Sequence, residues 1–154
     1  MMQLKKILTT NIYSNNYCRI EPYKKDATNL FDYFTETENL LQFGTTNKND
    51  NEILKEFENK PWQFYSLIYS QHSQKLRGYL RFIVVDDTQR IISLHGGGIG
   101  KGIAETRVYV EAWKHILHIL KNELQCSRIE SYCNNENTKA KVFLEKTGIE
   151  IINN

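Results

Sequence analysis

The chain has 154 residues, of which 40% are hydrophobic and 25% charged, and its formal net charge is +2. This length suffices for one domain, residues 1–154, with a buried core, and the composition is typical of a soluble globular protein. The small net charge and scattered basic residues argue against a nucleic-acid partner, and no apolar run reaches the roughly 20 residues that a membrane span needs.

The N-terminus and the cysteines favour a cytoplasmic protein. Residues 1–10 contain a basic pair but neither an adequate apolar region nor a small-residue cleavage site, so we expect no signal peptide. Cys18, Cys126 and Cys133 are an odd number of cysteines without a Cys-x-x-Cys motif or nearby paired histidines. We therefore expect reduced thiols and no bound metal.

The first part of the chain predicts one strand and two helices. Residues 1–16 are polar and rich in asparagine, which indicates a loose lead-in, and Tyr17–Tyr23 reads as a first strand. Asp26 can cap a helix, and a shorter helix ends before Pro61. The apolar side chains expected to face the core from these helices are Ala27, Leu30, Phe31, Phe34, Leu41, Ile53, Leu54 and Phe57.

From Trp62 onward, the hydrophobic pattern has the period of two that is typical of strands. Trp62–Tyr69, Gly78–Val85 and Ile91–His95 predict three consecutive antiparallel strands. A long helix follows, with one apolar stripe formed by Trp113, Ile116, Leu117, Leu120 and Leu124. Arg128–Cys133 is then reached by a helical crossover, so it should lie parallel to Ile91–His95.

Between the third strand and the long helix, five of the chain's eight glycines fall within seven positions, from Gly96 to Gly102. A strand, a glycine loop and a helix N-terminus together present backbone N–H groups to an anion. Two familiar phosphate motifs are absent. A Walker A loop would need glycine at His95 and a hydroxyl residue at Gly102, and the dinucleotide fingerprint would need glycine at Ile103.

The C-terminal segment adds a second pattern. Asn137 is a good helix cap, Ala140, Phe143 and Leu144 share one helical face, and Gly148 ends the helix before a short strand at Ile149–Ile152.

These two patterns resemble the GNAT superfamily of N-acetyltransferases, and within it the Rim-type branch that acetylates ribosomal proteins. The resemblance extends from Tyr17 to Ile152, and the spacing of Asn, Ala, Lys and Gly over residues 137–149 is its most specific part. It implies an α/β (α+β) fold whose mostly antiparallel sheet splays in a V between two parallel strands, flanked by about four helices.

The resemblance also implies a site for acetyl-CoA. The glycine loop and the helix N-terminus would hold the pyrophosphate, with Lys101 or Arg107 pairing with a phosphate. The pantetheine arm would fill the gap beside Ile91–His95 as an added strand. The residues expected to bind acetyl-CoA are Leu94, His95, Gly98, Ile99, Gly100, Lys101, Gly102, Ile103, Arg107, Asn137, Ala140, Phe143 and Leu144.

Three features depart from the family pattern. The Gln or Arg that usually precedes the loop glycines is replaced by His95, Gly97 or Ile99, depending on the register. Leu144 stands where many members have the tyrosine that protonates the departing thiolate. The family's last strand is missing before Asn154, which would leave a sheet edge for a homodimer to cover.

We therefore expect a cytoplasmic N-acetyltransferase that moves acetyl from acetyl-CoA to a primary amine by direct attack. His95 is the candidate base, because a near-neutral pKa would suit a proton acceptor; alternatively, it only hydrogen-bonds the loop. A GNAT-fold protein that binds coenzyme A without turnover is the alternative function, and an interaction module that binds no coenzyme is a third. The acceptor, whether a peptide N-terminus or a small-molecule amine, stays open.

Overall fold

The computed structural model describes residues 3–24, 60–97, 103–133, 138–147 and 149–153. The helices expected between Asp26 and Pro61, the loop from Gly98 to Gly102 and the cap at Asn137 lie outside the described residues.

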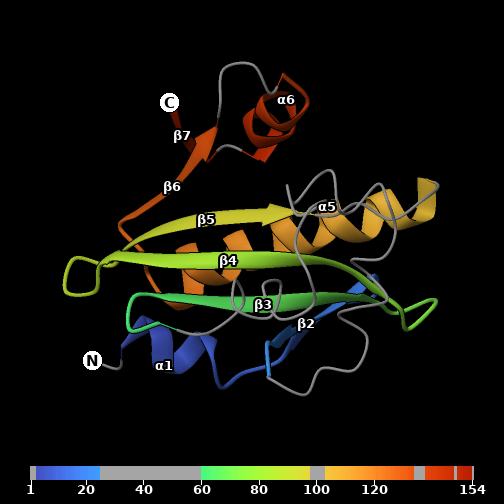
Figure 1. Cartoon of the computed structure of the whole chain (residues 1–154), viewed down its shortest axis with the longest axis horizontal. Coiled ribbons are helices and arrows are strands. Elements are labelled where there is room, and N and C mark those ends of the chain that lie inside the picture. The colour runs from blue at the N-terminus through green and yellow to red at the C-terminus, as the bar shows by residue number, and fades with distance from the viewer. Residues whose placement is uncertain (1–2, 25–59, 98–102, 134–137, 148, 154) are drawn as a thin grey trace, which may run out of the picture.

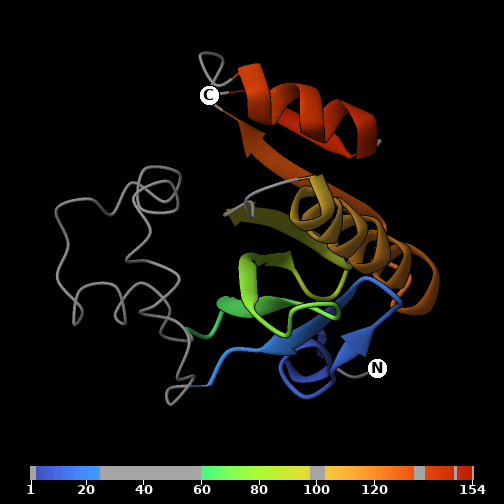
Figure 2. The same ribbon diagram turned by 90° about the vertical axis from the view of Figure 1, so that its right-hand side faces the viewer.

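A seven-stranded sheet organises the described part of the chain, with its strands in sequence order from β1 to β7. The strands are β1 (Tyr13–Ser14), β2 (Cys18–Pro22), β3 (Gln63–Ser70), β4 (Leu76–Asp86), β5 (Ile91–Gly97), β6 (Arg128–Cys133) and β7 (Glu150–Asn153). The helical elements are α1 (Leu4–Leu8), α5 (Ile103–His118), the π-helical turn η1 (Ile119–Glu123) and α6 (Thr138–Thr147). Figures 1 and 2 show α5 lying along the sheet and α6 beside the last two strands.

The strand directions confirm the predicted topology. The pairs from β1–β2 to β4–β5 are antiparallel, whereas β5–β6 and β6–β7 are parallel. The two-residue period of the sequence therefore predicted the antiparallel strands correctly, and the helical crossover correctly predicted the parallel pair. The described residues contain three α-helices, and the mixed α+β fold class is as predicted.

Alternation along the strands gives the sheet two faces. The helix face packs against α5 and consists of Phe64, Ile68, Leu80, Phe82, Ile92 and Leu94. The register places the opposite face on the neighbouring positions, Tyr65, Tyr79, Arg81, Ser93 and His95.

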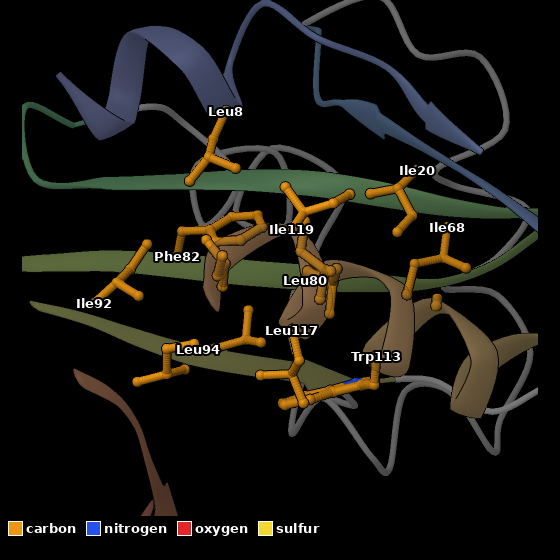
Figure 3. Packing of buried hydrophobic residues seen from close by; sticks show 14 of the residues in the cluster. Leu8, Ile20, Ile68, Leu80, Phe82, Ile92, Leu94, Trp113, Leu117 and Ile119 are labelled. Atoms are coloured by element: carbon orange, nitrogen blue, oxygen red, sulfur yellow. The ribbon is translucent and has the colours of Figure 1, made fainter. Parts of the chain in front are cut away.

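The core lies between the helix face and α5. The predicted apolar stripe is confirmed, because Trp113, Ile116 and Leu117 of α5 and Leu120 of η1 are buried there and Leu124, at the end of η1, packs against them. Figure 3 shows Trp113 and Leu117 close to the leucines of β4 and β5. The rings of Phe64 and Phe82 stack across neighbouring strands with their centroids 5.2 Å apart.

The expected loose lead-in over residues 1–16 is wrong. Residues 4–8 form α1, whose Leu4 and Leu8 are fully buried in the core, and residues 13–14 form the edge strand β1. A carboxylate oxygen of Asp87 accepts a hydrogen bond from the backbone N–H of Leu4 at 2.9 Å. This contact satisfies a free donor at the start of α1, so a distant turn supplies the cap that the local sequence lacks.

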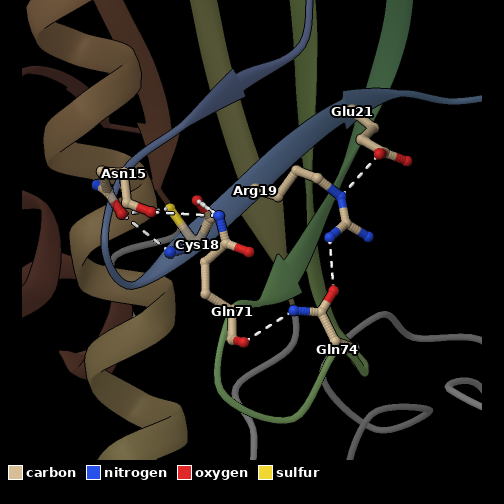
Figure 4. A network of polar contacts seen from close by, with 6 residues as sticks. All are labelled: Asn15, Cys18, Arg19, Glu21, Gln71 and Gln74. Carbon is tan, nitrogen blue, oxygen red and sulfur yellow. Dashed lines mark hydrogen bonds and ion pairs between the residues drawn. The ribbon is translucent and has the colours of Figure 1, made fainter.

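Polar contacts connect the turns at one end of the sheet (Figure 4). The side-chain oxygen of Asn15 accepts hydrogen bonds from the backbone N–H groups of Tyr17 and Cys18 at 2.8 and 2.9 Å. Arg19 donates to Glu21 at 2.7 Å and to Gln74 at 2.8 Å. Cys18 and Cys126 carry free thiols, as expected. Among the helices of the described residues, none combines the length and hydropathy of a membrane span.

Candidate active site

The two parallel strands β5 and β6 separate after a short stretch of pairing. They pair at only three positions, from Ile91–Arg128 to Ser93–Glu130. Strand β5 nevertheless continues to Gly97, where it still pairs with Tyr79 of β4. Figure 1 shows β6 running away from β5 beyond this point. The edge of β5 from Leu94 to Gly97 therefore has no strand partner on its β6 side among the described residues, and the predicted V-shaped splay is confirmed.

His95 lies on this open part of β5, on the opposite face of the sheet. Its Nε2 is 2.8 Å from the hydroxyl oxygen of Ser93, which is fully buried. Burial, and to a lesser extent the neighbouring cation of Arg81, lowers the pKa of His95 from 6.5 to about 4. The expected near-neutral pKa is therefore wrong, because desolvation and a cation both disfavour the imidazolium. His95 is a neutral imidazole at physiological pH.

Arg81 is the cation that sequence reasoning missed. It lies on β4 directly opposite His95, with Tyr65 as its partner on β3, so all three side chains share the opposite face. In the sequence, Arg81 is one of several basic residues in a strand pattern. Only the register of β4 against β5 identifies it as part of the site.

Gly96 lies at the splay, where atoms of neighbouring residues closely approach its backbone. A β-carbon at Gly96 would be 2.6 Å from the hydroxyl oxygen of Tyr109, 2.8 Å from the carbonyl oxygen of Tyr79 and 3.1 Å from the Trp113 ring. Only glycine fits here without displacing a neighbour. The glycine cluster thus begins with a residue that α5 requires for packing.

The Tyr109 side chain that contacts Gly96 is buried. Burial raises its pKa well above the ordinary value of 10.0. A phenol of such high pKa is a poor proton donor to a thiolate, so Tyr109 does not replace the tyrosine that Leu144 lacks. Its position on the side of α5 that packs against the sheet indicates a packing role.

Helix α6 packs against α5 through Phe143. The Phe143 ring lies 5.5 Å from the ring centroid of Tyr109 and 5.5 Å from that of Trp113, in an edge contact with the latter. Leu144 is buried in the hydrophobic core cluster. Leu94 is also buried, on the helix face, so only its backbone borders the splay.

Arg107, the predicted phosphate contact on α5, is held by Tyr17. Its guanidinium carbon lies 4.4 Å from the centroid of the Tyr17 ring, and it donates a hydrogen bond of 2.5 Å to the Tyr17 hydroxyl. The side chain is exposed near the N-terminal end of α5. An exposed guanidinium with a fixed direction remains able to bind an anion with its other N–H groups.

The structure describes only some of the remaining residues that were predicted to contact acetyl-CoA. Gly98, Ile99, Gly100, Lys101, Gly102 and Asn137 lie outside the described residues. Ile103 is the first residue of α5 and Ala140 lies within α6, and their contacts with acetyl-CoA stay predictions. Among the described residues, no group of His, Cys, Asp and Glu is arranged to hold a metal ion.

Comparison with known proteins identifies the fold. No family model and no curated protein matches the sequence. Solved structures do match. One is a Vibrio cholerae protein assigned as a ribosomal-protein-serine acetyltransferase, with 16% identity and a TM-score of 0.71 over 91% of this chain and 83% of that chain.

Two further structures show the same similarity. A probable GNAT-family acetyltransferase from Chromobacterium violaceum has 14% identity and a TM-score of 0.75 over 89% of this chain and 72% of that chain. A nucleotide-linked sugar GNAT has 12% identity and a TM-score of 0.67 over 88% of this chain and 80% of that chain. The predicted GNAT fold is therefore confirmed.

Proposed function

We propose that this chain, which has the GNAT fold, is an N-acetyltransferase that moves acetyl from acetyl-CoA to a primary amine. The observation that carries the proposal is the open edge of β5. Pairing with β6 stops at Ser93, and the unpaired edge leads directly to the glycine-rich segment and to the N-terminus of α5. An extended ligand with amide groups can add to such an edge by backbone hydrogen bonds.

The residues present suit acetyl-CoA. The backbone of Leu94–Gly97 would hold the pantetheine arm, and Phe143 would flank the thioester end together with Asn137. The amides of residues 98–102 and the first turn of α5 would hold the pyrophosphate, because a helix N-terminus favours negative charge. Lys101 and Arg107 supply cations for the phosphates. Bound acetyl-CoA supplies an activated acyl group as a thioester.

The reaction then needs positioning and two proton transfers. The amine nitrogen attacks the thioester carbonyl carbon, a C–N bond forms and the C–S bond breaks. The nitrogen loses a proton, and the departing sulfur gains one. His95 is the candidate acceptor of the amine proton, because its imidazole is neutral and lies on the open part of β5. Since Leu144 cannot protonate the sulfur, that proton comes from water, from the substrate ammonium or from another side chain.

Binding and turnover can be tested separately. A ligand that binds only the native state at about 100 times its dissociation constant adds about 2.7 kcal/mol to the free energy of unfolding. Thermal unfolding should therefore shift upward with acetyl-CoA or coenzyme A, and not with ATP or NAD. No shift at millimolar acetyl-CoA would contradict the proposal.

A thiol-release assay over a panel of amines then distinguishes transfer from the alternative function. Release of coenzyme A that depends on an added amine supports an acetyltransferase. Binding of acetyl-CoA without release with any amine favours the protein that binds coenzyme A without turnover. A homodimer through the sheet edge at β7 stays a prediction, which sedimentation can check.

A further inference from the structure

Arg81 lies in the middle of the sheet, where burying a charged side chain costs free energy. It is half-buried on the opposite face of β4, between the register partners Tyr65 of β3 and His95 of β5. Arginine is rarely buried unless it is paired.

Within the part of the chain that the structure describes, the guanidinium of Arg81 has no ion-pair partner. Its Nε is buried without a hydrogen-bond partner. The ion pairs among the described residues are Arg19–Glu21, Lys114–Glu111 and Arg128–Glu130, none of which includes Arg81. Its charge acts on the neighbouring strand, where it contributes, after burial, to the lowered pKa of His95. A buried donor on a charged group that is left unsatisfied costs free energy, and a bound ligand is one partner that would satisfy it.

We propose that Arg81 binds a carboxylate of the acceptor, so that the substrate is a small primary amine carrying a carboxylate, such as an amino acid. The inference rests on the proposed function. A carboxylate matches the planar fork of a guanidinium, and a bidentate pair would satisfy the orphaned donor. Opposing side chains on neighbouring strands have β-carbons about 4.5–5.5 Å apart. A carboxylate at Arg81 would therefore place an amine a few bonds away within reach of His95.

The same contact would assist proton transfer. The cationic Arg81 disfavours a second positive charge on His95, and a bound carboxylate would neutralise that effect. His95 would then be a better base in the presence of the acceptor than in its absence. The bound acceptor would thus raise the basicity of the imidazole that removes its proton.

Matched acceptors test the carboxylate directly. We would measure kcat/KM for the standard amino acids and for their carboxamides, which keep the amine and lose the charge. For the preferred side chain, the wild-type protein should favour the acid by about tenfold or more, which corresponds to about 1.4 kcal/mol. Arg81→Gln should lose this preference and Arg81→Lys should keep part of it. Arg19→Gln, which removes an arginine already paired with Glu21, should keep all of it.

Two measurements without turnover accompany the assay. Calorimetry on the protein saturated with coenzyme A should show the acid binding at least tenfold more tightly than its amide, and Arg81→Gln should abolish that difference while the affinity for coenzyme A stays unchanged. The free Arg81→Gln variant should unfold at the same or a higher temperature than wild type, because it removes a half-buried charge whose Nε has no hydrogen-bond partner.

Each contrary result has a distinct meaning. Equal use and binding of acid and amide by wild type would overturn the carboxylate site and leave acetyl transfer standing. An equal preference in wild type and Arg81→Gln, or a clear loss of stability in that variant, would show that Arg81 serves the fold. Failure of the protein to bind acetyl-CoA or coenzyme A would overturn the proposed function and this inference together.

Discussion

The hydroxyl of Tyr109 lies so close to Gly96 that a β-carbon on Gly96 would come within 2.6 Å of its oxygen. The contact joins α5 to the end of β5, at the point where β6 has already turned away. It fixes the depth at which the helix packs, and with it the position of the helix N-terminus beside the splay.

We expect Gly96→Ala to destabilise the fold by about 1–3 kcal/mol, the usual cost of forcing a methyl group into a packed site. Tyr109→Phe removes the nearer of the two obstructing oxygens, so adding it to Gly96→Ala should restore part of the loss. The carbonyl oxygen of Tyr79, at 2.8 Å, prevents full recovery. Chemical denaturation of the single and double variants measures the coupling. Additive effects of the two substitutions would contradict the proposed close contact.

The glycine-rich segment gives a second prediction. We expect Gly100→Asp to abolish the thermal shift caused by acetyl-CoA, because a carboxylate at a helix N-terminus would repel the pyrophosphate and a side chain would block close backbone approach. Thr88→Asp is the matched control, since it adds the same charge in the exposed turn before β5. An unchanged shift in Gly100→Asp would place the phosphate site elsewhere. Circular dichroism of the free variant shows whether it is folded.

Sequence patterns predicted the strands well because hydrophobic alternation is local. Trp62–Tyr69 and Gly78–Val85 correspond to β3 and β4 within two residues, and Arg128–Cys133 is β6 itself. Helix α1 was missed for the opposite reason. It has five residues, and it depends on burial of Leu4 and Leu8 and on a hydrogen bond from a distant turn. A short helix is marginal without such tertiary contacts.

The sequence indicated candidate residues for the site but not their electrostatics. His95 could be named because it ends a strand before the glycines. Its low pKa could not, because both causes arise across strands: burial against the sheet and the cation of Arg81 on β4. The packing of Tyr109 onto Gly96 likewise depends on how α5 crosses β5, which the spacing of residues along one element does not determine.

The shifted pKa of His95 should be visible in the stability of the fold. Its pKa is 6.5 in the unfolded chain and about 4 in the folded protein. Between these values the unfolded state binds more protons, so the free energy of unfolding falls as the pH decreases from 6.5 to about 4. Allowing for partial exposure of the ring, we expect a loss on the order of 2 kcal/mol. The contribution of His95 to the free energy of unfolding is complete above the pKa that it has in the unfolded chain.

Denaturation of wild type and His95→Gln across this pH range isolates the contribution, because other groups titrate in both proteins. The difference between the two should diminish toward acid pH. His118→Gln, which changes an exposed histidine of α5, should follow the wild-type curve. A constant difference between wild type and His95→Gln would mean that the folded protein does not disfavour the imidazolium.

The last prediction concerns the role of His95 in the reaction. As a base with a lowered pKa, His95 stays neutral from about pH 5 upward, so with an acceptor that carries no carboxylate it should impose no rise of kcat near pH 6.5. His95→Ala should lower kcat by about a hundredfold, while the dissociation constant of acetyl-CoA changes little. Ser93→Ala is a useful companion, because it removes the hydroxyl 2.8 Å from Nε2 and keeps the imidazole. It should lower kcat by less than His95→Ala does. Equal kcat in wild type and His95→Ala would show that positioning of the two substrates, and not His95, is the main source of the rate.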